Sequence, residues 1–350
     1  MSDLGQLLSD QIRAAFTDLQ PLVIRGNNSK AFYGNTITGQ DLDVTGHTGI
    51  ISYEPSELVL TARAGTKLSE IKEVLAQHGQ MLAFEPPSFG DATLGGTIAC
   101  NLSGPRRPYA GAARDFVLGC RIINGKGEIL KFGAEVMKNV AGYDVSRLMT
   151  GAMGTLGVLL DISLKVLPIQ QQRSSLRIEI DAKQALNLFS DWRQKPLPIT
   201  AACHDGNALT VRLAGSTSAL SAAKNKIGGE QLAYSTDFWQ QVREHEHDFF
   251  KDERPLWRLS IPSASNINIE GDQFIDWGGA QRWLLSKQDA KDIRSIVENA
   301  GGHASLFRGN KSDIECFHPL QKNMLTIQQL LKKAFDPQQI LNPGKMYNTL

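Results

Sequence analysis

The chain has 350 residues, of which 41% are hydrophobic and 21% are charged, and 37 basic residues nearly balance 36 acidic ones. This length suggests about two domains, and the composition is that of an ordinary globular protein. A net charge of +1, with no cluster of basic residues, argues against a nucleic-acid-binding protein, which would carry a basic stripe.

The first twenty residues predict an amphipathic surface helix, because apolar residues from Leu4 to Leu19 recur at helical spacing between charged ones. The segment lacks the basic start and unbroken apolar core of a signal peptide. The longest uncharged stretch, near residues 148–160, is too short and too rich in glycine to span a bilayer. We therefore expect a cytoplasmic protein without a transmembrane segment.

Further along the first half, the apolar run at 23–24 predicts a strand that ends in a loop rich in Gly, Asn and Ser. A helix is expected at 66–79, with Thr66 as N-cap and Gly79 as C-cap. Residues 116–133 predict a hairpin whose tight turn uses Asn124-Gly125 for positive φ. Further strands are predicted at 49–55, 58–65 and 158–168.

In the second half, the polar stretch 170–175 predicts a linker, and strand and helix patterns alternate after it. This alternation favours an α+β or α/β layer with helices on one face of a sheet. A last helix at 319–335 precedes the tail 336–350. The other strands are predicted at 176–180, 208–215, 255–263, 281–286 and 303–309, and the other helices at 183–194, 217–229 and 287–302.

The cysteines and the closest histidines predict no metal site. No two cysteines form a CxxC pair, so the spacing fits neither a disulfide framework nor an iron–sulfur cluster, and we interpret all of them as single core thiols. His245 and His247 would lie on different faces of a helix, among charged neighbours that indicate solvation. The cysteines are Cys100, Cys120, Cys203 and Cys316.

Three glycine-rich stretches, at 25–34, 86–108 and 148–162, carry the strongest functional signal. Each alone suits a surface turn, because Gly, Asn and Ser are the usual turn formers. Each also suits an anion site, since backbone N–H groups in such loops, or in a short helix capped by Thr93, can bind phosphate. No G-x-G-x-x-G fingerprint and no P-loop pattern is present. Together the stretches predict one extended ligand wrapped by several loops.

These stretches also carry a family resemblance. VIRGNNS (23–29), PPSFGDATLGGTIACNLSGPRRPYAGAARDFVLG (86–119) and EVMKNVAGYDVSRLMTGAMGTLGV (135–158) resemble the FAD-binding domain of the vanillyl-alcohol-oxidase, or PCMH, type over about residues 20–168. FDPQQILNPGKM (335–346) resembles the terminal signature of its 2-hydroxy-acid branch. GPRRPYAGAARDFVLG, MKNVAGYD, IDWGGAQRWL and NAGGHASLFR together resemble the FAD-binding E-subunit family of bacterial glycolate oxidase over essentially the whole chain.

The resemblance implies an α+β fold with a two-part PCMH-type FAD-binding domain and a smaller α+β cap domain. The FAD-binding domain is expected at 1–170 and the cap, or substrate-type, domain at 171–318. A C-terminal helix and tail, 319–350, would return to the FAD-binding domain.

The same resemblance implies FAD as cofactor, with a pyrophosphate cradle at 25–29 and a second loop around the diphosphate and ribityl groups. Some members of this fold link flavin covalently through a His near the position of Ser29, so serine there implies dissociable, non-covalent FAD. The implied FAD-binding residues are Arg25, Gly26, Asn27, Asn28, Ser29, Pro87, Ser88, Thr93, Gly95, Gly96, Asn101, Ser103, Gly104, Gly154, Leu156 and Val158.

Oxidation of a 2-hydroxy acid needs a base for the hydroxyl proton, a cation for the carboxylate and the flavin as hydride acceptor. His303 is the candidate base, since histidine titrates near neutrality. Arg258, Arg282 and Arg308 are candidates for the carboxylate clamp, although arginines on strands also snorkel to solvent. The related D subunits carry a longer cap and a histidine cluster near a GDGN motif, which this chain lacks.

The resemblance thus implies a FAD-binding subunit of a glycolate oxidase, which takes part in oxidising glycolate to glyoxylate or relays its electrons. Its implied partners are a second FAD-containing, D-type subunit and an iron–sulfur, F-type subunit, through which it would reach the inner membrane. Two alternatives stay open: a structural FAD-containing scaffold, and a stand-alone FAD-dependent oxidoreductase of another 2-hydroxy acid.

Overall fold

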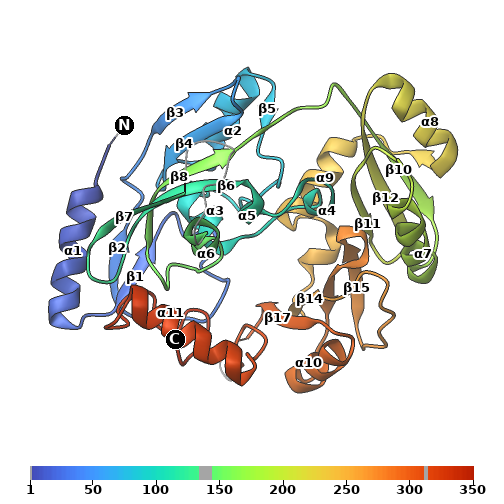
Figure 1. Cartoon of the computed structure of the whole chain (residues 1–350). Coiled ribbons are helices and arrows are strands. Elements are labelled where there is room, and N and C mark those ends of the chain that lie inside the picture. Colours follow the sequence, from blue (N-terminus) through green and yellow to red (C-terminus); the bar gives the residue numbers. More distant parts are fainter. Residues whose placement is uncertain (1, 134–143, 311–313) are drawn as a thin grey trace. The chain divides into compact units, whose positions relative to one another are not determined.

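The computed structural model describes residues 2–133, 144–310 and 314–350, which form two compact units (Figure 1). Unit 1 comprises Met1–Leu102, Ala112–Pro168 and Pro319–Leu350, and unit 2 comprises Ser103–Gly111 and Ile169–His318. The motif MKNVAGYD, apart from its last residue Asp144, lies outside the described residues. Both units mix helices with sheets, so the predicted α+β class is confirmed.

Unit 1 is built on a five-stranded antiparallel sheet of order β3-β4-β8-β6-β7, with β1 and β2 forming a separate parallel pair. Its strands are β1 (Leu22–Arg25), β2 (Gln40–Asp43), β3 (Ile50–Glu54), β4 (Val59–Arg63), β5 (Gln80–Met81), β6 (Val117–Ile123), β7 (Ile129–Gly133), β8 (Val158–Lys165) and β9 (Leu167–Pro168). Its helices are α1 (Gly5–Asp18), α2 (Leu68–Gln77), α3 (Leu94–Cys100), α5 (Ala113–Phe116), α6 (Val145–Met149) and α11 (Lys322–Phe335).

The C-terminal end of the chain adds to the β1–β2 pair. Leu22 forms a parallel bridge with Leu341, and its backbone N–H donates to Ile340 O at 2.7 Å. The buried face of α1, which carries Leu8 and Ile12, packs with these residues in one apolar cluster. The tail is therefore part of the core of unit 1, although it is more than 300 residues from β1 in sequence.

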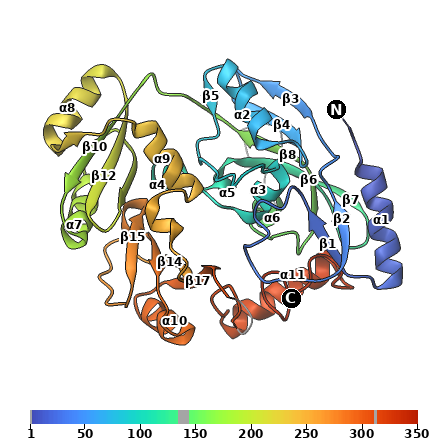
Figure 2. The ribbon, with the colours of Figure 1, turned by 180° about the vertical axis from the view of Figure 1, so that it is seen from behind.

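Unit 2 is built on an eight-stranded antiparallel sheet of order β13-β10-β12-β11-β15-β16-β14-β17. Helices α7 and α8 flank β12 and β10 (Figure 2), while α10 packs on β17. The strands are β10 (Gln172–Glu179), β11 (Ile199–His204), β12 (Ala208–Gly215), β13 (Glu230–Gln231), β14 (Leu256–Ser260), β15 (Asp272–Asp276), β16 (Gln281–Leu285) and β17 (His303–Arg308). The helices are α4 (Arg107–Ala110), α7 (Ala182–Arg193), α8 (Thr217–Ile227), α9 (Ser235–Glu244), α10 (Ala290–Asn299) and the short 3₁₀ helices η1 (Asp248–Lys251) and η2 (Trp277–Gly279).

Three local predictions were wrong. The expected linker 170–175 largely belongs to β10, where Ser175 is buried and accepts a hydrogen bond from Trp239 Nε1 at 2.9 Å. In the β6–β7 turn the positive φ falls on Gly127, at 76°, because the Asn124 side chain itself accepts from the N–H groups of the turn. Thr66 does not cap α2, since its hydroxyl accepts from Gly49 N–H instead.

No helix within the described parts of the chain is both long enough and apolar enough to cross a membrane.

Candidate functional site

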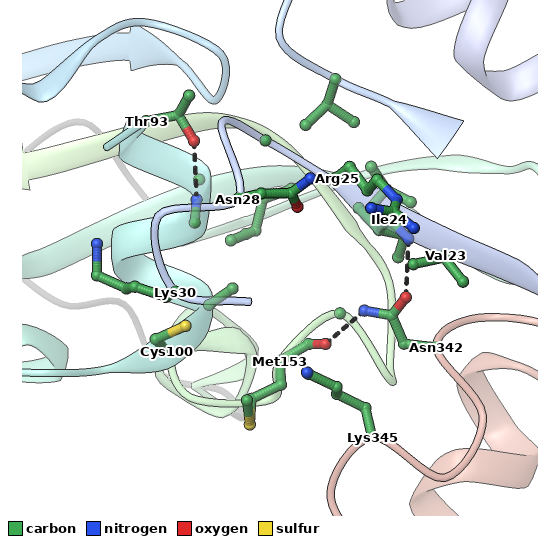
Figure 3. A pocket seen from close by; sticks show the side chains of 18 of the residues that line it. Val23, Ile24, Arg25, Asn28, Lys30, Thr93, Cys100, Met153, Asn342 and Lys345 are labelled. Atoms are coloured by element: carbon green, nitrogen blue, oxygen red, sulfur yellow. Dashed lines mark hydrogen bonds between the residues drawn. The ribbon is translucent and has the colours of Figure 1, made fainter. Parts of the chain in front are cut away.

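A cavity of about 290 Å³ lies inside unit 1, where the loop after β1, the start of α3 and the loop before β8 come together (Figure 3). All three predicted glycine-rich stretches contribute to its wall. The predicted residues that line it are Arg25, Gly26, Asn27, Asn28, Ser29, Thr93, Gly95, Gly96, Gly154 and Val158. The structure thus brings the loops together as the prediction of one wrapped ligand required.

The other predicted cofactor residues are not in the wall of this cavity. They are Pro87, Ser88, Asn101, Ser103, Gly104 and Leu156. Ser88 still reaches it indirectly, because its carbonyl oxygen accepts from Lys30 Nζ at 3.3 Å. Ser103 and Gly104 belong to unit 2, and Gly104 O accepts from Trp277 Nε1 at 3.0 Å. These residues remain predictions.

The glycines of the wall allow backbone segments to approach closely. A Cβ on Gly26 would lie 2.5 Å from Thr93 Oγ1. Thr93 caps α3, accepting from Gly96 N–H at 3.3 Å, so the predicted cap is observed. A Cβ on Gly95 would lie 2.8 Å from Ala64 Cβ, so this glycine allows α3 to pack against the end of β4.

The wall is positively charged. Arg25, Lys30 and Lys345 line it, and none of the described lining residues is an aspartate or a glutamate. Lys30 is only 7% exposed, whereas Arg25 is paired with Asp41 at 2.6 Å near the surface. Cationic side chains, small donors and close backbone approach fit the diphosphate of a dinucleotide cofactor.

Sequence reasoning missed several residues of this cavity. Cys100 lines it, so the interpretation of every cysteine as a core thiol was wrong for this one. Burial raises the pKa of the Cys100 thiol, which therefore stays protonated near neutral pH. The others include Lys30, Met153, Asn342 and Lys345. The motif FDPQQILNPGKM contains Asn342 and Lys345, but its sequence did not indicate that either residue lines this cavity.

In unit 2, two predicted catalytic residues share one face of the sheet. His303 pairs with Ser260 between β17 and β14, and Arg258 pairs with Ser305 two positions away. Since residues two apart on a strand point to the same side, His303 and Arg258 are diagonal neighbours. His303 is exposed, yet desolvation, followed by the positive charges of Arg258 and His318, lowers its pKa. The imidazole is therefore neutral near pH 7 and able to accept a proton.

Arg258 is held in place by two contacts. Its Nε donates to Gln281 Oε1 at 2.7 Å, and its guanidinium lies 5.2 Å from the ring centroid of Trp277. Arg107, from α4, lies 4.3 Å from the same ring. Two of the motifs that carried the resemblance to the E-subunit family, GPRRPYAGAARDFVLG and IDWGGAQRWL, thus meet at Trp277.

The two other candidate arginines hold loops. Arg308 Nη2 donates to the carbonyl oxygens of Phe250 and Asp252, and Arg282 donates to those of Gly279 and Ser265. Desolvation lowers the pKa of Arg282 to about 10. These contacts favour structural roles, and a role for Arg308 in substrate binding remains a prediction.

His245 is half-buried and packed among aromatic rings, contrary to the expectation of a solvated histidine. Its ring stacks on Phe250, with centroids 4.0 Å apart and planes 5° from parallel. Burial, followed by the charges of Arg308 and Arg258, lowers the pKa of His245 to about 3. Among the described residues, no group of three or more His, Cys, Asp or Glu side chains could hold a metal ion.

Residues 204–207 read His-Asp-Gly-Asn, one letter from the GDGN motif of the D subunits. They form the turn between β11 and β12, where Asp205 Oδ1 accepts from the backbone N–H groups of Asn207 and Ala208. Asp205 Oδ2 accepts from Arg177 at 2.9 Å. The contacts of Asp205 stabilise the turn, so the resemblance to the GDGN motif is limited to the amino-acid sequence.

Comparison with known proteins identifies the family. An FAD-binding domain model matches residues 7–133. Glycolate oxidase subunit GlcE of Escherichia coli (strain K12) is 50% identical over 350 residues, which cover 99% of each chain. The chain belongs to the GlcE family of glycolate oxidase subunits.

More distant relatives share the same framework. D-lactate dehydrogenase of Archaeoglobus fulgidus is 26% identical over 347 residues, covering 82% of this chain and 76% of the relative. Glycolate oxidase subunit GlcD of Bacillus subtilis (strain 168) is 29% identical over 158 residues, covering 45% of this chain and 34% of that protein. An alkyldihydroxyacetonephosphate synthase structure superposes with a TM-score of 0.68 at 14% identity, over 96% of this chain and 74% of the other, which shows a shared fold.

These comparisons confirm the predicted family, the PCMH-type FAD-binding fold and FAD as the cofactor. They also confirm the interpretation of the chain as an FAD-dependent oxidoreductase subunit.

Proposed function

We propose that this chain is the FAD-binding subunit of a multi-subunit glycolate oxidase, in which it relays electrons from glycolate oxidation or shares in that oxidation. The observation that carries the proposal is the cationic, glycine-walled cavity of unit 1 in a chain that matches GlcE from end to end. FAD, when bound, supplies a hydride acceptor. The residues that line the cavity would hold the cofactor.

Residues 25–29 and the start of α3 would bind the FAD diphosphate, with Lys30 adding charge. Without a covalent histidine, and with a protonated Cys100, the cofactor would be held non-covalently. In unit 2, which we take as the cap domain, Arg258 would bind a small carboxylate. His303 would accept the hydroxyl proton, because its lowered pKa keeps it neutral.

The proposed partners are a D-type, FAD-containing subunit and an iron–sulfur, F-type subunit. The proposed location is the cytoplasm, or the inner membrane through those partners. The relatives named GlcE and GlcD are both described as subunits of glycolate oxidase, which supports a complex. The predicted FAD loops line the cavity of unit 1, whereas unit 2 offers His303 as the candidate base and Arg258 as its neighbour. This difference supports a complex in which the partner subunits take part in the oxidation of glycolate.

Anaerobic mixing of the purified chain with glycolate tests this, with flavin absorbance followed over time. We expect slow bleaching or none for the chain alone, and rapid bleaching once the partner subunits are added. Rapid bleaching of the lone chain, lost on His303→Ala, would instead establish a stand-alone oxidoreductase. A flavin that stays oxidised while the assembled complex turns over would establish a structural scaffold.

A further inference from the structure

The C-terminal segment 336–345 lies against two of the FAD loops through one side chain. Asn342 Oδ1 accepts from Ile24 N–H at 2.8 Å, at the end of β1, and its Nδ2 donates to Met153 O at 2.7 Å (Figure 3). Its backbone N–H donates to Leu22 O at 3.0 Å. Asn342 is 6% exposed and lines the cavity. One amide thus spans the two loops that enclose the cofactor space.

The surrounding backbone is shaped to fit this amide. Gly154 has a φ of 76°, and a Cβ on it would lie 2.6 Å from Asn342 Nδ2. Asn342 itself has a φ of 43°, a left-handed conformation that asparagine tolerates better than most residues. The glycine at 154 therefore makes room for the tail amide as well as for the cofactor.

A buried ion pair fixes the start of the segment. Lys332 Nζ donates to Asp336 Oδ2 and Thr155 O, both at 2.8 Å, and to Leu341 O at 2.7 Å. The carboxylate of Asp336 accepts in turn from the N–H groups of Ile340 and Leu341. Asn342 is therefore presented to the cavity by a rigid support.

The end of the segment carries charge to the same wall. Lys345 lines the cavity, and its Nζ donates to Asn35 O at 3.1 Å, just after the loop that follows β1. Its carbonyl oxygen accepts from Asn35 N–H at 3.0 Å. This lysine ties the same loop to the tail while adding a positive charge beside the diphosphate space.

We propose that segment 336–345 is part of the FAD site, with Asn342 as a positioning residue that sets the spacing of the β1 loop and the 151–157 loop. FAD binding and docking of the tail are then coupled, because the cofactor binds the loops only at the spacing that Asn342 fixes. Lys345 favours ligands that carry phosphate. The proposal concerns cofactor binding and is independent of the substrate.

The test is titration of FAD into apoprotein, followed by flavin fluorescence. Asn342→Gly removes both side-chain hydrogen bonds without straining a left-handed backbone. We expect the Kd of FAD to rise about tenfold or more, since two hydrogen bonds are lost. Asn342→Asp keeps the acceptor for Ile24 N–H but sets an anion against Met153 O, and it should weaken binding at least as much.

Ser9→Ala is the matched control, because Ser9 is buried in unit 1 and donates to Gly127 O at 2.6 Å away from the cavity. It should lower stability and leave the Kd of FAD unchanged. Lys345→Met should weaken FAD more than riboflavin, which has no phosphate, whereas loss of a structural contact would weaken both equally. Asn342→Gly with wild-type FAD affinity would overturn the proposal.

Hydrogen exchange of the wild-type chain decides the matter even if the variants do not fold. FAD should slow exchange of the Ile24 N–H and of residues 340–345 together. FAD-induced protection of the β1 loop without protection of 340–345 would show that the tail is not coupled to the cofactor.

Discussion

Trp277 donates its indole N–H to the carbonyl oxygen of Gly104 at 3.0 Å, which joins the segment Ser103–Gly111 to the end of β15. That segment follows α3, Asn101 and Leu102 in sequence, so the continuation of a predicted cofactor loop packs on the sheet of unit 2. The guanidinium groups of Arg107 and Arg258 both lie over the Trp277 ring. The Trp277 side chain therefore connects the segment Ser103–Gly111 to Arg258, which is a candidate substrate-binding residue.

Trp277→Phe should destabilise the protein by about 0.5–1.5 kcal/mol, because it removes the indole hydrogen bond to Gly104 O, while that carbonyl keeps its second donor, Arg107 N–H at 3.1 Å. Trp257→Phe is the control. Trp257 is 2% exposed, but its Nε1 has no hydrogen-bond partner among the described residues, so the change removes no hydrogen bond and costs only packing and part of the contact with the Arg294 guanidinium. Urea unfolding of both variants provides the comparison. Equal losses would mean that the bond to Gly104 contributes nothing.

The FAD of the purified protein should be released completely by acid or heat. Serine stands at position 29, and the one cysteine found in the described wall, Cys100, has a raised pKa that disfavours the reactive thiolate. The measurement is flavin absorbance in the supernatant after acid precipitation. Flavin fluorescence on the denatured polypeptide in a gel would contradict it.

Gly96→Val should fold but lose FAD, whereas Gly95→Val should lose both stability and FAD. A Cβ on Gly96 meets only Thr93 Oγ1, at 3.3 Å, so a larger side chain there would enter the cavity. A Cβ on Gly95 meets Ala64 at 2.8 Å, which forces β4 and α3 apart. Flavin content and melting temperature separate the two effects, with Gly96→Ala as the intermediate case. A Gly96→Val protein with full flavin content would be incompatible with the site.

Acid should destabilise the protein partly through His245. Its pKa is 6.5 in an exposed histidine and about 3 here, so between these values the unfolded chain binds a proton that the folded chain does not. Stability is therefore lost as pH falls through this window, by at most about 1.4 kcal/mol per pH unit. His245→Phe should keep much of the stacking on Phe250 and flatten the acid side of the profile. Urea unfolding at pH 7.5 and pH 5 checks this, and an unchanged pH dependence would rule it out.

The parts of the site that were predictable are those with a local signal. The loop 25–29, the Thr93 cap and the glycines at 95, 96 and 154 stand out because glycine and small polar residues interrupt apolar patterns. Asn342 and Lys345 lie in the tail motif, but that motif gave no indication that they line this cavity. Their place in the wall depends on parallel pairing of residue 341 with β1, a contact between opposite ends of the sequence.

The fold was predictable to a similar degree. Helices with clear amphipathic spacing, such as α1 and α10, were found, while β11 was missed because all six of its residues are buried and show no alternation. The start of β10 was taken for a linker because its residues are polar, yet Ser174 and Ser175 are buried and Ser175 accepts a hydrogen bond from Trp239 of another element. A polar residue that is buried by contacts with distant elements cannot be recognised from its own segment of the sequence.

The place of segment 336–345 in the cavity wall also bears on biosynthesis. In chain order this segment follows every other wall of the cavity, so during translation it leaves the ribosome last among them. A nascent chain that has already folded the sheet of unit 1 still has β1 without its neighbour on the tail side. A cavity with all of its walls can therefore form only after segment 336–345 has left the ribosome, later than the strands that make up the rest of unit 1.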